Sequence, residues 1–276
     1  MNADSSADAT LRTRSSTGPE LVPIVALAWL AVAVPLLIIG AVVFAIIPGV
    51  AWWLGALVGA LVATVLIAAR LRGTAPRLLD AIGAEPAAED DHARYYNLVE
   101  GLSLAGGIGQ PELYVLDDDA RNVAVVARGD QSAIVVTAGL LDTLDRIGLE
   151  GIIAEAMVRI GNGDAEAATV GSSLFGPLIS GPLAMVTKPV ATIGLRKLLG
   201  SDRDLLADRE AVALTRYPPG LLAALDVVRA GTPIVGEPNP ATDHVWLVPP
   251  SAVDPQAEVV IKAAPLDLRI DVLGEL

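Results

Sequence analysis

The sequence predicts an α+β membrane protein, in which an N-terminal transmembrane helical hairpin precedes a mainly helical domain with a small β-sheet. The 276 residues are 53% hydrophobic and yet carry a formal net charge of −13, so apolar and charged residues must occupy different parts of the chain. Residues 21–69 contain no charged side chain. This run is roughly twice the ~20 apolar residues that cross a bilayer core. Helical periodicity and short β-branched runs alternate in the remainder.

Composition excludes several classes of function. The chain has no cysteine, which rules out disulfides, thiolate metal ligands and cysteine nucleophiles. Its only histidines are His92 and His244, so most histidine chemistry is hard to build. The acidic balance argues against a nucleic-acid partner, because phosphate backbones are bound by clusters of Lys and Arg.

The first segments are expected to be a disordered tail at 1–20 and a transmembrane hairpin at 21–70. The tail is rich in Ser, Ala, Thr and Asp and has no apolar period. A Pro-Gly pair at 48–49 lies near the middle of the apolar run and has the composition of a tight turn. We therefore expect antiparallel helices at about 22–46 and 51–69.

Basic residues flank this hairpin and predict its orientation, because positive charge accumulates on the cytoplasmic side. They are Arg12 and Arg14 before the first helix, and Arg70, Arg72 and Arg77 after the second. Trp52 and Trp53, at the turn, favour the opposite interface. Gly55 and Gly59 form a small-x-x-x-small pair that permits close helix approach. We expect a protein integral to the plasma membrane, with both termini and the soluble domain in the cytoplasm.

The remaining residues, 71–276, are expected to form one cytoplasmic domain. It opens with helical segments broken near Pro86, the second of them at Asp90–Leu104. Strands are expected next, because apolar runs rich in valine are separated by polar turns. These strands are Glu112–Leu116, Val123–Val126 and Ala133–Thr137.

The second half of the domain is expected to be mainly helical. Apolar residues recur at helical spacing in Leu149–Ile160. Residues 165–197 are apolar but interrupted by prolines, so we expect helices that enter the membrane shallowly or pack against the hairpin. The other expected elements are helices at 202–216 and 219–230, a short strand near Val245–Val248 and a closing helix near Leu266–Leu273.

Several segments of this domain follow one another in a recognisable order and spacing. They are Pro111–Val115, Arg121–Val125, Ala133–Leu141, Leu149–Glu155, Asn162–Asp164, Asp204–Asp208 and Pro265–Ile270. Together with the hairpin, they resemble the HtpX and CAAX-prenyl-protease family of membrane zinc metallopeptidases. The resemblance implies a zincin-like domain, in which a helix with the motif H-E-x-x-H lies against the helix that supplies the third zinc ligand.

The chain departs from this family at the zinc motif. In the family, two imidazoles lie one turn apart and the Glu between them polarises the metal-bound water. The corresponding residues here are Ala154, Glu155 and Val158, so both histidines are missing and the glutamate is kept. Asp204 stands where the family has its third ligand, a Glu. Asp208 stands where a carboxylate orients a zinc-bound histidine, and here it must find another donor. We expect no metal and no cofactor, since one carboxylate cannot hold zinc.

Structural explanations exist for the remaining polar residues. Glu155 precedes Arg159 by four residues, the favourable order for an ion pair within a helix. Ser201 and Asp204 have the spacing of a capping box at a helix N-terminus. His244 is far from the zinc motif in sequence, and we expect it in the core or in a loop.

These observations predict a catalytically inactive member of the family, a pseudopeptidase that acts as a scaffold, adaptor or regulator in a membrane protein assembly or in protein quality control. The degenerate site would comprise Ala154, Glu155, Val158, Asp204 and Asp208. The alternative is an active membrane-bound enzyme with a rebuilt, non-HExxH site. It would be either a peptidase with a rebuilt metal site or a hydrolase that uses Glu155, Asp204 and Asp208 as acid and base. A transporter or channel subunit has less support, because the apolar run has no ionisable residue to mark a pathway.

The hairpin makes the lipid bilayer an expected partner. In the family that the chain resembles, membrane peptidases work in quality control beside ring-forming scaffolds of the stomatin and prohibitin type. The resemblance therefore implies other membrane proteins, including such a ring scaffold, as partners.

Overall fold

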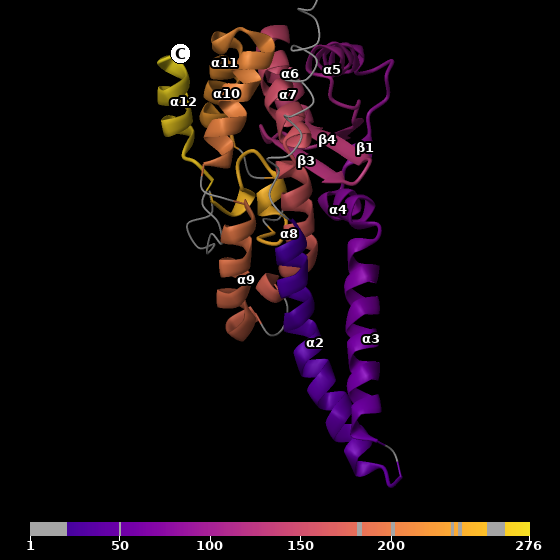
Figure 1. Cartoon of the computed structure of the whole chain (residues 1–276). Coiled ribbons are helices and arrows are strands. Elements are labelled where there is room, and N and C mark those ends of the chain that lie inside the picture. The colour runs from indigo at the N-terminus through magenta and orange to yellow at the C-terminus, as the bar shows by residue number, and fades with distance from the viewer. Residues whose placement is uncertain are drawn as a thin grey trace, which may run out of the picture.

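A computed structural model of the chain describes residues 21–49, 51–180, 184–199, 202–232, 235–236, 239–252 and 263–276. The predicted tail at 1–20 lies outside these residues. Within the described part the protein is mainly helical with a small mixed sheet, and a long N-terminal hairpin projects from the rest of the molecule (Figure 1). The mainly helical α+β class expected from the sequence is therefore confirmed.

Two helices form the hairpin, α2 at Leu21–Ile46 and α3 at Trp52–Leu71. Both are long and apolar enough to cross a membrane. Many of their large apolar side chains are exposed, including Ile38 in α2 and Leu61 in α3. A water-soluble protein rarely exposes so continuous an apolar surface, so the hairpin is compatible with a surrounding of lipid.

Small residues let the two hairpin helices approach closely. A Cβ atom added at Gly55 would overlap the carbonyl oxygen of Gly40, and one added at Gly59 would overlap that of Leu36. The small-x-x-x-small prediction for α3 is therefore confirmed. Trp29 also joins the helices, because its Nε1 donates to Thr64 Oγ1 at 3.0 Å.

The helices that follow the hairpin are α4 (Thr74–Ile82), α5 (Ala93–Gly106), α6 (Ala138–Thr143), α7 (Arg146–Gly161), α8 (Asp164–Ser180), α9 (Ala184–Leu199), α10 (Arg203–Thr215), α11 (Pro218–Ala230) and α12 (Leu266–Gly274). The α7, α10, α11 and α12 helices begin or end within a few residues of the predicted bounds. The apolar segment 165–197 forms α8 and α9, which pack against α3 and α2 respectively. Its entry into a membrane, and the domain boundaries, stay predictions.

The sheet has the strand order β1-β2-β4-β3. Its strands are β1 (Glu85–Pro86), β2 (Glu112–Leu116), β3 (Val123–Arg128) and β4 (Gln131–Thr137). β4 pairs in parallel with β2 and antiparallel with β3, while β1 pairs antiparallel with β2. The longer strands were predicted, but β1 was not. It is a two-residue edge strand, a place in a sheet where a proline is tolerated.

Both faces of the sheet are covered by helices (Figure 1). Val123 and Val125 of β3 belong to the apolar cluster that contains the buried side chains of α5 and α7. Ala124 and Val126 belong to a second cluster, with side chains of α4 and α8. A strand buried on both faces needs apolar residues throughout, which explains why β3 shows no alternation of apolar and polar residues.

The strand predicted near Val245–Val248 is wrong. A 3₁₀ turn, η2, occupies Asp243–Val245, and only an isolated bridge links Trp246 to Ala124 of β3. Asn122 is the physical reason. Its buried side-chain amide donates to the Val248 carbonyl at 2.7 Å and its Oδ1 accepts from the Val248 amide at 3.2 Å, so a side chain takes the place of further ladder bonds.

Candidate active site

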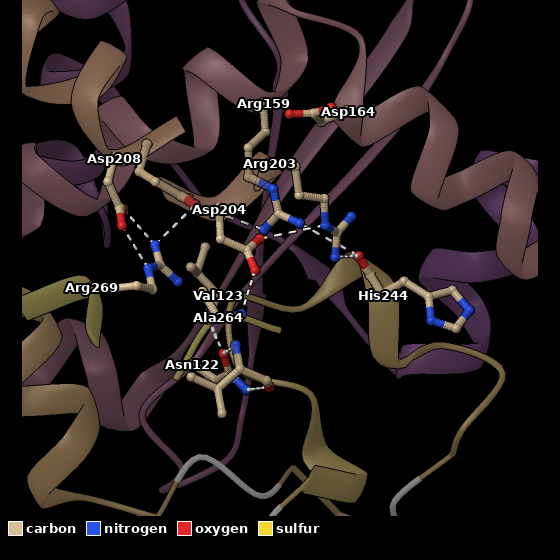
Figure 2. A network of polar contacts seen from close by, with 12 residues as sticks. Asn122, Val123, Arg159, Asp164, Arg203, Asp204, Asp208, His244, Ala264 and Arg269 are labelled. Carbon is tan, nitrogen blue, oxygen red and sulfur yellow. Dashed lines mark hydrogen bonds and ion pairs between the residues drawn. The ribbon is translucent and has the colours of Figure 1, made fainter. Parts of the chain in front are cut away.

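Three helices bring the predicted site residues together. α7 packs against α10, as the family resemblance requires, and α10 packs against α12. The charged side chains that meet between them are Glu155 and Arg159 from α7, Arg203, Asp204 and Asp208 from α10, and Arg269 from α12 (Figure 2). We call these six residues the charged cluster. All of them are buried.

Arg269 is the centre of one half of the charged cluster. Its Nε and Nη2 atoms donate to the two carboxylate oxygens of Asp208 at 2.7 and 2.6 Å (Figure 2). The same Nη2 donates to Glu155 Oε1 at 3.3 Å. Burial alone would lower the pKa of Arg269, but Asp208 and Glu155 raise it above its usual value. Arg269 is thus the new donor that Asp208 needs.

Asp204 is held by two partners from opposite directions. Its Oδ2 accepts from the Ala264 amide, just before α12, at 2.9 Å, and its Oδ1 lies 3.4 Å from Arg203 Nε. Asp202 is the N-cap residue of α10, and Ser201 lies outside the described residues. The capping-box interpretation therefore does not account for the contacts of Asp204, because its carboxylate is used in a tertiary hydrogen bond.

The other half of the charged cluster faces η2. Arg159 Nη2 and Arg203 Nη2 donate to the His244 carbonyl at 3.5 and 3.4 Å (Figure 2). The imidazole of His244 points away from both arginines (Figure 2). Burial, reinforced by the charge of Arg203, lowers the pKa of His244 to about 3. His244 is therefore a neutral core residue, as expected.

The two carboxylates nearest the former zinc motif have opposite electrostatic surroundings. Burial raises the pKa of Glu155, and the arginines around it only partly oppose this effect. Burial would also raise the pKa of Asp204, but Arg203, Arg269 and Arg159 together hold it below its usual value. Glu155 thus favours the protonated form more than an ordinary glutamate does, while Asp204 favours the ionised form.

The residues present do not fit a zinc centre of the H-E-x-x-H type. Ala154 and Val158 are buried at the two histidine positions and have no atom that can bind a metal. Within the described parts of the chain, no His, Asp and Glu side chains form a group that could hold a metal ion. The carboxylate oxygens of Asp208 are both taken by Arg269, whose positive charge opposes a cation at the same place.

Comparison with curated proteins shows which family the chain resembles. The chain is 29% identical over 221 residues to a protease HtpX homologue of Dictyoglomus turgidum, a match that covers 70% of this chain and 72% of that protein. It is 32% identical over 196 residues to the protease HtpX homologue of Dictyoglomus thermophilum, a match that covers 61% of this chain and 64% of that protein. The protease HtpX homologue of Tropheryma whipplei is 27% identical over 196 residues, which are 61% of this chain and 67% of that protein.

The chain is similar in sequence to HtpX homologues over about two thirds of its length. The resemblance seen in the sequence is therefore confirmed, and with it a membrane location for the protein. No family model and no solved structure matches the chain.

The prediction of an inactive pseudopeptidase that serves as a scaffold, adaptor or regulator is wrong. The HtpX-like relatives are named as proteases, which points to an enzyme, and nothing in these matches points to an inactive scaffold. The error has a physical origin. The missing histidines at Ala154 and Val158 remove one way of activating water, but acid–base chemistry by the retained carboxylates does not depend on them.

The sequence did not reveal the role of the arginines. Arg269 was part of the segment Pro265–Ile270 that carried the resemblance, but its spacing gave no indication of its partners. Glu155 was expected to pair with Arg159, and the two do lie 4.0 Å apart, yet the shorter contact of Glu155 is with Arg269. Arg203 belonged to none of the motifs recognised in the sequence. Its burial, and that of Asp204 and Asp208 on the same helix, is visible only in the fold.

Replacing Arg269 by methionine should destabilise the protein by about 3–5 kcal/mol, because Asp208 and Glu155 would remain buried without their donor. Unfolding by denaturant in detergent micelles, followed by circular dichroism, measures the change. Arg229→Met is the matched control, since Arg229 forms exposed ion pairs with Asp226 and Asp267 and should have little effect. Equal stabilities of the two variants would contradict the structural role of Arg269. Adding Asp208→Asn to Arg269→Met should restore part of the loss.

Acid should destabilise the protein through His244. The unfolded state takes up a proton near pH 6.5, whereas the folded state resists it down to a pKa of about 3. The stability that neutral His244 contributes is therefore present above pH ~6.5 and is lost as the pH falls toward 3. Melting temperatures between pH 7 and 4 should fall less steeply in His244→Gln than in the unsubstituted protein.

Proposed function

We propose that this chain is a membrane-bound peptidase whose acid–base chemistry is carried by the charged cluster instead of an H-E-x-x-H zinc centre. The HtpX-like relatives are named as proteases, which supports peptide-bond hydrolysis. The observation that carries the proposal is the opposite shift of two neighbouring carboxylates: the pKa of Glu155 is raised and that of Asp204 is lowered. Pairs of this kind divide the roles of acid and base in hydrolases.

The roles follow from these protonation states. Asp204, ionised, is the general base that takes a proton from water as the water attacks the peptide carbonyl. Glu155, more readily protonated, is the general acid that gives a proton to the departing amine. The guanidinium groups of Arg203 and Arg269 lie beside these carboxylates and would stabilise the negative charge that develops on the carbonyl oxygen.

Access of substrate requires a movement of α12. Glu155 and Asp208 are almost completely buried, and the Ala264 amide occupies Asp204 Oδ2. A peptide could reach the carboxylates if the segment from Ala264 to Arg269 moves away from α10. We include this opening in the proposal, since substrate-linked closure also excludes water from the reacting groups.

The membrane arrangement belongs to the same proposal. The arginines that flank the hairpin support a cytoplasmic location for both termini and for the charged cluster, in the plasma membrane. Substrates would then be membrane or cytoplasmic proteins, consistent with a role in protein quality control. A ring-forming membrane scaffold of the stomatin or prohibitin type is the proposed partner, which rests on the family resemblance.

Purified full-length protein in detergent micelles should cleave an unfolded substrate such as casein, and cleavage should persist in the presence of a zinc chelator. Glu155→Gln and Asp204→Asn should each reduce kcat by about 10²–10⁴, the usual contribution of a positioned acid or base. The control is Glu210→Gln. Glu210 is an exposed residue on the same helix as Asp204, so this variant should keep full activity. Absence of cleavage by the unsubstituted protein, or equal rates in Glu155→Gln, would refute the proposal.

Single cysteines can test the orientation cleanly, because the chain has no cysteine of its own. In sealed cells an impermeant maleimide should label Pro48→Cys, at the exposed hairpin turn, from outside. Asp130→Cys, at the exposed turn between β3 and β4, should react only after the cells are permeabilised. The reverse pattern would place the charged cluster outside the cytoplasm and overturn the proposed arrangement.

A further inference from the structure

A cavity of about 350 Å³ lies where the hairpin joins the rest of the molecule. It is lined by the end of α3, by α4 and by α8, together with residues of the loop before η2. Figure 1 shows that α4 follows directly on α3 at this junction. None of the residues of the charged cluster lines the cavity, so it is a separate site.

Two arginines and several hydroxyl groups supply the polar lining of this cavity. They are Arg70, Arg77, Thr74, Ser172, Ser173, Ser180 and Thr242. Arg70 is held in place, since its Nε donates to the Ser173 carbonyl at 2.9 Å while Ser173 Oγ donates to the Arg70 carbonyl at 3.1 Å. Among the residues that the structure describes, neither Arg70 nor Arg77 has a carboxylate in ion-pair contact. Both positive charges are therefore available to a ligand.

Ser172 gives a second, independent indication of a ligand. Its side chain lines the cavity and is only 7% exposed. Its hydroxyl has no hydrogen-bond partner within the described ranges. A buried hydroxyl normally has a partner, because leaving it unpaired costs about 1–3 kcal/mol. An acceptor bound in the cavity would satisfy it.

The position of the cavity identifies the acceptor. Arg70 is in the last turn of α3, so the cavity lies at the depth where a transmembrane helix meets the lipid headgroups. The whole protein has a formal net charge of −13. Two arginines without acidic partners make this cavity locally positive in an otherwise acidic protein. Guanidinium groups and hydroxyls together are the usual ligands of phosphate. The apolar side chain of Leu78, also in the lining, suits the glycerol and acyl portion of a lipid.

We propose that this cavity binds the phosphate headgroup of an anionic phospholipid from the adjoining membrane leaflet. Arg70 and Arg77 neutralise the phosphate, and the hydroxyl of Ser172 donates to one of its oxygens. The bound lipid thereby fixes α8 against the end of α3, at the joint between the anchor and the soluble part.

Native mass spectrometry of the full chain in detergent micelles, titrated with phosphatidylglycerol, tests this site. One phosphatidylglycerol should bind more tightly than phosphatidylcholine. Arg77→Gln should weaken its binding about fivefold, the effect expected for one arginine at a membrane surface. Ser172→Ala should also weaken it. Arg77 is exposed, and Ser172→Ala removes only a hydroxyl, so both variants should fold.

Arg72→Gln is the matched control. Arg72 is an exposed arginine two residues after Arg70 that does not line the cavity, so the variant should bind phosphatidylglycerol as the unsubstituted protein does. If Arg72→Gln and Arg77→Gln weaken phosphatidylglycerol binding equally, the effect comes from general surface charge and the proposal is overturned. Displacement of the lipid by millimolar inorganic phosphate would assign the cavity to free phosphate, which also contradicts a lipid site. Equal affinity for phosphatidylcholine would exclude recognition of an anionic headgroup.

Discussion

The buried contact of Arg269 with Asp208 and Glu155 is the interaction on which the arrangement of the soluble part depends. It joins α12, α10 and α7, which are far apart in the sequence. Charges buried to this extent are tolerated only when each is paired and hydrogen-bonded. The bidentate contact with Asp208 meets that requirement, since both carboxylate oxygens are used. The position of α12 is therefore tied to the two helices that, in the family the chain resembles, carry the zinc ligands.

The same contact shapes the electrostatic surroundings at the positions that correspond to the family's zinc motif. With Ala154 and Val158 at the histidine positions, the α7 surface there offers apolar side chains in place of imidazoles. The carboxylates that remain are surrounded by guanidinium groups, which supply the positive charge that a metal ion would otherwise bring. Desolvation outweighs the arginines at Glu155 and raises its pKa, whereas the arginines outweigh desolvation at Asp204 and lower its pKa, so two carboxylates in one cluster favour different protonation states.

The anchor and the soluble part are connected by packing as well as by the chain. The two helices of the hairpin pack closely where glycine lets one helix contact the backbone of the other. Packing of this kind also stabilises helix pairs in lipid, because it does not depend on the exclusion of water. α8 continues this packing, since it contacts α3 on one side and the sheet on the other. The Ala127 amide donates to Thr169 Oγ1 at 3.0 Å, which fixes α8 to β3. The junction between the hairpin and the rest of the molecule is thus linked to the charged cluster through α8 and the sheet.

The sequence by itself determined the elements whose formation depends on local composition. An uncharged run with a Pro-Gly turn fixed the hairpin, and continuous apolar runs fixed β2, β3 and β4. The order of motifs also predicted that α7 lies against α10. Only the tertiary structure decided the partners of the charged residues. The bond from Ala264 to Asp204, the pairing of Arg269 with Asp208 and the turn at Asp243–Val245 join segments distant in sequence. Periodicity reports which face of an element is buried, whereas a salt bridge or tertiary hydrogen bond depends on which faces meet.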